Sequence, residues 1–345
     1  MPPATPHPAQ QSKIVPMPRI AIPLPHSSDR EYAERAIPPY ERAVELAGGV
    51  PIRIPLDQPQ SEIKKLIATC HAVLLPGSKA DVDPAKFHAP RSPRTAPADV
   101  PRNTVDELLL EDAYRQRKPI LGICYGLQSL NVFRSGSLIQ HIPDFLPEET
   151  RAIVDHEAGK KVAVAHNVEI RTNSNLAEIL RRKSITAQVP PATTVRLATV
   201  PSAEVPTGTT VHVATAASAV QRSEASANSS QPSPARAASP EAPNESPLIL
   251  PVNSSHHQSA DTIGQDLRIA ARCSADGIIE ALEGTAPDHF VLAVQWHPER
   301  SVEEDESSRN IFRALVEAAR HRHKESKTPA QNSKAGTTVT PSVET

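Results

Sequence analysis

Aromatic rings and thiols are scarce in this chain. Of its 345 residues, 3% are Phe, Trp or Tyr, and three are cysteines: Cys70, Cys124 and Cys273. An odd, sparse set of cysteines argues against a disulfide framework and favours a reducing compartment. No apolar run reaches the roughly 18 residues of a membrane span, and the first residues, MPPATPHPAQQSK, lack the apolar core of a signal peptide. We therefore expect a cytoplasmic protein with no membrane partner.

The chain also has no large net charge of either sign. The 37 Lys and Arg residues nearly balance 39 Asp and Glu residues, giving a net charge of -2, so no nucleic-acid partner is expected. The 36 prolines and few aromatics indicate a folded part diluted by disordered segments. We predict a disordered arm at 1–17, a low-complexity insertion at 181–246 and a disordered tail at 323–345. Residues 18–180 and 247–322 are left to form one folded domain.

Hydrophobic spacing alternates between strand and helix periods along the folded part. Strands are predicted at 19–24, 50–55, 72–75, 120–123, 138–140, 162–170, 248–252 and 290–296, and an antiparallel pair at 267–272 and 278–282. Helices are predicted at 29–47 (split by two prolines), 62–69, 104–116, 175–180 and 308–319, and after Cys124. Strands that alternate with helices predict an α/β fold with a mostly parallel sheet.

Cys124 stands at the turn between a predicted buried strand and a helix, with Gly122 and Gly126 two residues away on each side. Glycines relieve the crowding where a side chain is displayed on such a turn. Helix N-terminal N–H groups favour an anion and lower the pKa of a thiol. The N–H of Tyr125 can then point at a developing oxyanion. The pattern favours a nucleophile; the alternative is a structural cysteine buried in a core strand.

A second turn, at Gly77 and Ser78, follows another predicted buried strand. The carboxyl ends of strands are where open α/β sheets place their ligands. The turn is therefore a candidate for a second oxyanion N–H, and an ordinary strand-to-helix turn is the alternative. The Asp81-Val82-Asp83 sequence just after it lacks the rest of a calcium loop, which favours turn or cap residues over a metal site.

His297 and Glu299 flank a proline at the end of the last predicted strand. The residue before a proline is held in extended geometry, where residues i and i+2 face the same way. An imidazole and a carboxylate placed side by side make a base and its orienting group. A surface histidine and glutamate in a strand-ending turn are the alternative. Together with a cysteine turn in the same chain, the pair predicts a triad of Cys124, His297 and Glu299.

Four segments carry a family resemblance. GICYGLQSLNV, PGSKADVDP, VNSSHHQ and VQWHPE, in that order, resemble class I glutamine amidotransferase-like hydrolases, and most closely the γ-glutamyl-γ-aminobutyrate hydrolase family. The resemblance implies a flavodoxin-like three-layer fold and hydrolysis of a γ-glutamyl amide through a Cys124 thioester. It implies that His297 is the base, that Glu299 orients it, and that the oxyanion lies between the Tyr125 N–H and the Gly77–Ser78 turn.

The same resemblance implies that Gln128 lines the glutamyl pocket and that His257 lies near the site. Tyr125 stands where the family usually has arginine, and the insertion has no counterpart in the family. A small γ-glutamyl substrate and water are the expected partners, and the oligomeric state, with a homodimer as one option, stays open. No cofactor and no metal are expected, because the adjacent His256 and His257 point to opposite faces of an extended chain.

Two other functions remain open at this stage. A glutamine amidotransferase component would deliver ammonia to a synthase, and it would need a partner because this chain holds no synthase domain. A non-catalytic scaffold of the same fold would use the 181–246 insertion as an interaction arm; the intact triad argues against it.

Overall fold

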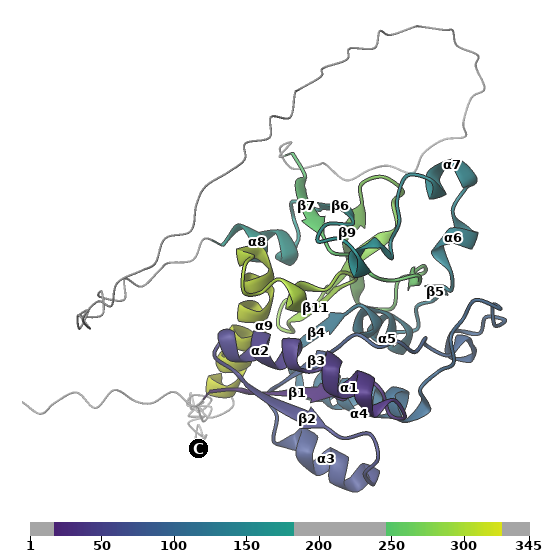
Figure 1. Ribbon diagram of the computed structural model, residues 1–345. Helices are drawn as coiled ribbons and strands as arrows, with labels where there is room; N and C mark the ends of the chain where they lie inside the picture. Colours follow the sequence, from purple (N-terminus) through teal and green to yellow (C-terminus); the bar gives the residue numbers. More distant parts are fainter. Residues whose placement is uncertain (1–16, 183–245, 326–345) are drawn as a thin grey trace, which may run out of the picture. The chain divides into compact units, whose positions relative to one another are not determined.

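A nine-stranded sheet organises the part of the chain that the structure describes (Figure 1). The structure is a computed structural model, and it describes residues 17–182 and 246–325. These belong to one compact unit. The strand order is β2-β1-β3-β4-β11-β10-β9-β6-β7. The strands are β1 (Arg19–Pro23), β2 (Val50–Ile54), β3 (Ala72–Leu75), β4 (Ile120–Ile123), β6 (His166–Ile170), β7 (Leu248–Val252), β9 (Leu267–Cys273), β10 (Ile279–Gly284) and β11 (Val291–Val294).

The first five strands in that order are parallel, and they form the centre of the fold. All residues of β3, β4 and β11 are buried, as expected for parallel strands that are covered on both faces. In the register, Gly122 of β4 lies between Leu75 of β3 and Ala293 of β11. The carboxyl ends of these three neighbouring strands therefore meet at one edge of the sheet.

The other four strands continue the sheet in antiparallel fashion. The predicted hairpin is present as β9 and β10, and its turn includes Gly277 at a φ of 75°. The strand predicted at 162–170 was too long, because β6 begins only at His166. Val162 and Val164 are 48% and 53% exposed, so their alternation does not mark a core face. A separate two-stranded sheet joins β5 (Leu138–Ile139) to β8 (Ser259–Ala260).

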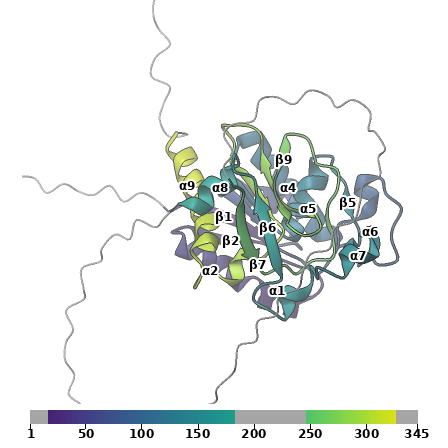
Figure 2. The ribbon, with the colours of Figure 1, turned by 90° about the horizontal axis from the view of Figure 1, so that it is seen from above.

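Helices cover both faces of the sheet and make a three-layer α/β fold, with α8 and α9 on one side and α4 and α5 on the other (Figure 2). Apolar residues of α2, α8 and α9 pack on one face, and those of α3, α4 and α5 pack on the other. The helices are α1 (Arg30–Ala36), α2 (Pro38–Leu46), α3 (Gln60–Ala68), α4 (Val100–Gln116), α5 (Tyr125–Phe133), α6 (Ile142–Phe145), α7 (Glu148–Arg151), α8 (Asn175–Arg181) and α9 (Glu306–Glu325).

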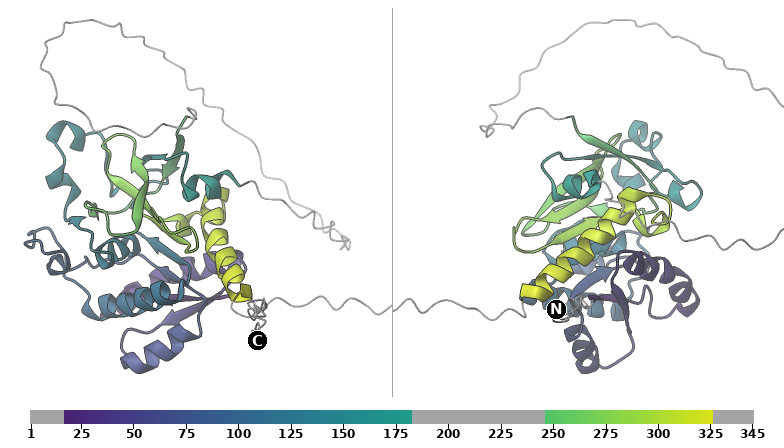
Figure 3. Two further views of the ribbon diagram at one scale, coloured as in Figure 1. Left: turned by 180° about the vertical axis from the view of Figure 1, so that it is seen from behind. Right: turned by 90° about the vertical axis from the view of Figure 1, so that its left-hand side faces the viewer.

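Two helices are longer than their sequence patterns predict. α4 begins at Val100 rather than at 104, because the Asp99 carboxylate accepts the Arg102 N–H and caps the helix, and Pro101 is tolerated in the first turn. α9 lies across the sheet (Figure 3, right) and takes in residues 323–325 of the predicted tail. The two prolines split the first helical segment into α1 and α2, as expected.

The predicted α/β fold with its parallel central strands is confirmed. The predicted N-terminal arm, the insertion and most of the tail lie outside the described residues, so the division of the chain into these segments stays a prediction. Among the described residues, no helix is both long and apolar enough to cross a membrane.

Candidate active site

Cys124 occupies a sharp turn between β4 and α5. Its φ of 53° lies in the left-handed region, and it is the N-cap of α5. Its N–H donates to the Val294 carbonyl at 2.8 Å, which ties the turn to β11. The two flanking glycines are required by close packing. A Cβ on Gly126 would lie 2.2 Å from the Leu75 carbonyl oxygen, and one on Gly122 would lie 2.8 Å from the Gly126 backbone.

His297 and Glu299 form the predicted pair, though not through extended backbone. Glu299 lies in a 3-10 turn, η3 (Pro298–Arg300), that begins directly after His297. The turn brings Nδ1 of His297 within 2.7 Å of Oε1 of Glu299. Both side chains are buried, with 5% of each residue exposed. A hydrogen bond from Nδ1 to a carboxylate fixes the tautomer and leaves Nε2 for the chemistry.

Cys124 lies beside the His297 imidazole, in the same pocket. Burial alone would lower the pKa of His297, but the Glu299 carboxylate and the nearby Cys124 raise it to about 9. Gly77 lies next to both groups, because a Cβ there would be 3.1 Å from Cε1 of His297 and 3.7 Å from Cβ of Cys124. The sequence-distant cysteine, histidine and glutamate therefore meet at the carboxyl edge of the parallel strands.

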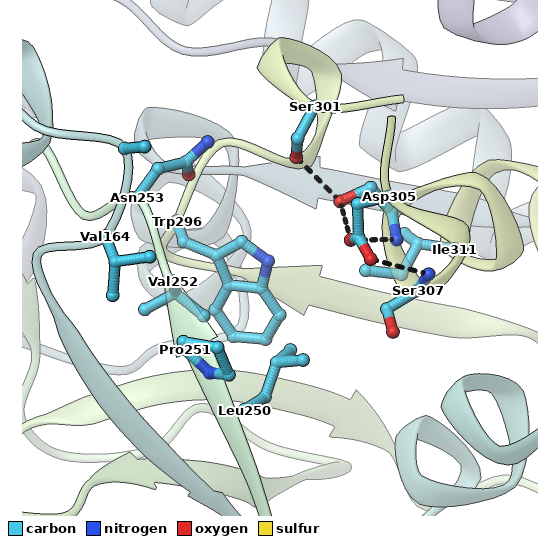
Figure 4. A pocket seen from close by; sticks show the side chains of 12 residues that line it. Val164, Leu250, Pro251, Val252, Asn253, Trp296, Ser301, Asp305, Ser307 and Ile311 are labelled. Atoms are coloured by element: carbon cyan, nitrogen blue, oxygen red, sulfur yellow. Dashed lines mark hydrogen bonds between the residues drawn. The ribbon is translucent and has the colours of Figure 1, made fainter. Parts of the chain in front are cut away.

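Asn253 holds the backbone of His297 in place. Its amide donates to the His297 carbonyl at 2.9 Å and accepts the His297 N–H at 2.9 Å. The preceding residue, Trp296, is buried beside Val252 and Leu250 of β7, and together with Asn253 it lines a mainly apolar pocket (Figure 4). The histidine is therefore positioned by β7 as well as by β11.

A pocket opens above Cys124 and His297. Lys79 and Arg300 bring positive charge to it, and Asp81 and Glu157 bring negative charge. Its full lining is Tyr32, Ser78, Lys79, Ala80, Asp81, Cys124, Gln128, Glu157, Ser255, His256, His257, Gln258, His297 and Arg300. A concave site with a few convergent polar groups is the usual form of a small-molecule site.

The predicted oxyanion turn differs from expectation at Gly77. The Gly77 N–H donates to the Tyr40 hydroxyl at 3.1 Å and is therefore not directed at a substrate. Ser78 lines the pocket, and its N–H meets no acceptor among the described residues. The buried Arg102 braces the turn by donating to the Pro76 carbonyl at 2.8 Å. The turn thus offers the N–H of Ser78 in place of the one on Gly77.

Of the other predicted binding residues, Gln128 and His257 line the pocket, as expected, whereas the Tyr125 side chain lies in the core. Nε2 of His257 is 3.1 Å from Asp81, and the Gln128 amide donates to the Gln258 carbonyl at 3.2 Å. The Tyr125 side chain points into the core, where its ring lies 4.9 Å from the Arg102 guanidinium. Only the backbone N–H of Tyr125, at the start of α5, is placed to face the site.

Three positioning residues were not identified from the sequence: Tyr40, Asn253 and Arg102. Asn253 stands inside the VNSSHHQ segment, so a signal for it was present. The sequence around Arg102 gave no role for its side chain. Tyr40 could not be told apart from an apolar core position of α2. Asp83 has a plain structural role, because its carboxylate accepts the Ala85 N–H at 3.1 Å and caps the 3-10 turn η1 (Pro84–Phe87).

The comparison with protein families agrees with this geometry. The Peptidase C26 family model matches residues 20–192 and 217–299, more than half of the chain. The chain belongs to the Peptidase C26 family. This family is class I glutamine amidotransferase-like, as the four sequence segments predicted.

Three curated relatives are 27–29% identical to the chain over the aligned residues. It is 28% identical to "Putative glutamine amidotransferase-like protein RP404" of Rickettsia prowazekii, over 82% of this chain and 88% of the relative. It is 29% identical to "Putative glutamine amidotransferase Rv2859c" of Mycobacterium tuberculosis, over 81% of this chain and 66% of the relative. It is 27% identical to gamma-glutamyl-gamma-aminobutyrate hydrolase PuuD of Escherichia coli, over 82% of this chain and 85% of the relative.

Proposed function

We propose that this protein hydrolyses the γ-glutamyl amide bond of a small γ-glutamyl amine, such as γ-glutamyl-γ-aminobutyrate. One observation carries the proposal: the His297 imidazole bonds the Glu299 carboxylate and lies near Cys124 in one pocket. A thiol, a base and an orienting acid in this order form the generalised triad for acyl transfer. Membership of the Peptidase C26 family supports a hydrolase of this kind.

In the first half of the proposed reaction, Cys124 attacks the γ-carbonyl carbon of the substrate. The Cys124 proton already resides on His297, whose pKa is about 9, and the C–S bond forms as the carbonyl oxygen becomes an oxyanion. The N–H groups of Tyr125 and Ser78 stabilise that oxygen. The C–N bond then breaks, His297 returns the proton to the departing amine, and a γ-glutamyl thioester remains on Cys124.

Water completes the cycle. His297 accepts a proton from the attacking water, the C–O bond forms, and the C–S bond breaks to release glutamate. The proton stays on His297 beside the released Cys124 sulfur, so the starting state of the enzyme is restored. Glu299 keeps its charge throughout and stabilises the imidazolium in both halves of the reaction.

The pocket charges support a glutamyl substrate. A γ-glutamyl group has an α-carboxylate and an α-ammonium at the end remote from the scissile amide. Arg300 and Lys79 offer positive charge for the first, and Asp81 and Glu157 offer negative charge for the second. Groups of opposite charge that line one pocket can orient a zwitterion, and this orientation would fix the γ-carbonyl relative to the thiol.

Cys124→Ala tests the proposal directly. We expect the variant to lose at least about 10³-fold in kcat on γ-glutamyl-γ-aminobutyrate, because no other group of the site replaces the nucleophile. Cys70→Ala is the matched control, since Cys70 is a buried thiol in the opposite part of the core, and it should keep its activity. Turnover of the Cys124→Ala variant at the wild-type rate would refute the proposal.

A second function, glutamine hydrolysis for a separate synthase, is favoured by the names of the relatives from Rickettsia prowazekii and Mycobacterium tuberculosis. The two functions differ in the leaving group. We expect kcat/KM for γ-glutamyl-γ-aminobutyrate to exceed that for glutamine. The reverse order, together with stimulation of glutaminase activity by a copurifying synthase, would favour the second function.

A further inference from the structure

Four buried side chains converge on one point below the substrate pocket. Nδ1 of His156, Nε2 of His166 and Nε2 of His256 lie 3.2, 3.2 and 3.3 Å from the same oxygen, Oε1 of Glu280. All four ligand atoms lie within 4.8 Å of one another. They come from four separate segments: the loop after α7, strand β6, the loop after β7 and strand β10.

Each histidine has its other ring nitrogen directed at an oxygen outside the cluster. For His156, Nε2 is 2.7 Å from the Asp276 carboxylate. For His256, Nδ1 is 2.8 Å from the Gln258 carbonyl, and for His166, Nδ1 is 3.4 Å from the Asn167 carbonyl. A neutral imidazole donates from one nitrogen only. These outer acceptors therefore select the tautomers whose lone pairs point inward.

The inward atoms are not paired with one another by hydrogen bonds. None of the three inward nitrogens and neither oxygen of Glu280 has a hydrogen-bond partner of ordinary geometry among the described residues. Three lone pairs and a carboxylate that face one another in a buried site repel unless a cation lies between them. Either protons or a metal ion must supply that positive charge.

We propose that His156, His166, His256 and Glu280 bind a zinc ion. Zinc in structural sites is tetrahedral, with N and O ligands at about 2.0–2.1 Å, which places neighbouring ligand atoms about 3.3 Å apart. The three distances from Glu280 match that spacing. Asp276 completes the site from outside, since a carboxylate on the far nitrogen of a ligating histidine fixes its ring and raises its basicity.

The site would hold two walls of the pocket together. His256 itself lines the pocket, next to His257, and His156 precedes the pocket residue Glu157. The ion thus links both loops to β6 and β10. The prediction of no metal from sequence treated His256 and His257 as a pair; the cluster uses only His256, together with partners 100, 90 and 24 residues away in sequence, which local spacing does not reveal.

Metal analysis of the full chain, purified without a histidine tag, tests the site. We expect about one zinc per chain, and less than about a tenth of that in His166→Gln and in Glu280→Gln. His289→Gln is the matched control, because His289 is also buried but bonds the Lys118 carbonyl outside the cluster; it should retain the metal. Circular dichroism of each variant checks that the fold is intact.

A second measurement on the wild-type protein does not depend on the folding of a variant. Chelator-treated protein should bind one equivalent of Co²⁺ with the visible absorption of a four-coordinate ion, and one equivalent of Zn²⁺ should raise its melting temperature by several degrees. A protein that is free of zinc as purified, and that shows neither the cobalt bands nor the thermal shift, would overturn the proposal and leave a proton-sharing cluster. Metal content is measured without substrate, so this result is independent of the proposed reaction.

Discussion

Single residues of the candidate site are placed by backbone geometry as much as by side-chain type. Cys124 has a left-handed φ of 53°, which is costly for a residue with a Cβ. The His297 backbone exchanges two hydrogen bonds with the Asn253 side chain. Glu299 reaches His297 through a 3-10 turn. The positions of the thiol, the imidazole and the carboxylate therefore depend on the surrounding backbone and on Asn253.

The Glu299→Gln variant is predicted to lower the pKa of His297. Burial opposes the imidazolium, and the Glu299 carboxylate is the largest influence that raises the pKa to about 9. Without that carboxylate, the pKa should fall by at least about one unit. A titration of the His297 ring by NMR measures both values, and an unchanged midpoint would show that Glu299 does not support the imidazolium.

The same pKa has a consequence for stability. The folded-state value of about 9 lies above the usual 6.5, so the stabilisation from protonated His297 is full below pH 6.5 and is lost as the pH rises toward 9. We expect the free energy of unfolding to fall across this window more in the wild type than in Glu299→Gln. Denaturant unfolding at pH 6 and pH 9 measures the difference. An equal fall in both proteins would contradict the assignment.

The Asn253→Ala variant is predicted to act on His297. Loss of two hydrogen bonds should lower the free energy of unfolding by about 2 kcal/mol and free the His297 backbone. We expect kcat to fall at least about tenfold with a smaller change in KM, since the substrate pocket does not include Asn253. Ser255→Ala, in the pocket lining two residues away, should instead act mainly on KM. Equal effects of both variants on KM would contradict a positioning role.

At the scale of elements, the strand β4, its turn and helix α5 form the unit on which the site is built. Local sequence predicted this unit well, because a buried apolar run, two glycines and a helical repeat are all local signals. It predicted β6 and α4 less well. The exposed Val162 and Val164 continue an alternating pattern beyond the strand, and the start of α4 depends on the cap by Asp99 rather than on apolar spacing.

The convergence of side chains was predictable only in part. Cys124, His297 and Glu299 stand in recognisable local motifs. The Tyr40 hydroxyl that takes the Gly77 N–H is 37 residues from it in sequence, and the cluster around Glu280 draws on four segments. No local pattern specifies which distant elements will pack together, so these contacts required the structure.

Two glycine-to-alanine variants compare the energetic cost of steric crowding, at Gly126 in α5, with that of a left-handed backbone, at Gly277 in the β9–β10 turn. Gly126→Ala would place a methyl group 2.2 Å from the Leu75 carbonyl oxygen, whereas at Gly277, with a φ of 75°, nothing lies within 4 Å of the added group. We expect Gly126→Ala to cost about 3 kcal/mol or more by overpacking. Gly277→Ala should cost only about 1 kcal/mol through its φ. Denaturant unfolding compares the two, and a smaller loss for Gly126→Ala would contradict the packing at the turn.

At the scale of the whole molecule, the sheet is assembled from both sides of the region 183–245, which the structure does not describe. β6 from before this region pairs with β7 from after it, and β4 pairs with β11. The candidate active site likewise takes its thiol from one side and its base from the other. The contacts that hold the site together are thus made within the compact unit.

We therefore predict that residues 186–243 are dispensable for folding and catalysis. Replacing them with a Gly/Ser linker of about 12 residues should leave a single unfolding transition, with the melting temperature within a few degrees of the wild type and kcat within about twofold. A permuted version of the natural segment, equal in length and composition, is the control for linker length. Loss of folding in the shortened chain but not in the permuted one would contradict this prediction. It would show that the connection from α8 to β7 must be longer than the linker.

The place of β11 has a consequence for how activity arises during synthesis. This strand is the last of the described strands in sequence, yet it lies in the sheet between β4 and β10, which are both translated before it. A nascent chain on the ribosome thus carries Cys124 without His297 for more than 160 residues of elongation. The thiol gains its partner only when β11 enters the middle of the sheet, so the proposed triad forms only after nearly all of the described chain has been made.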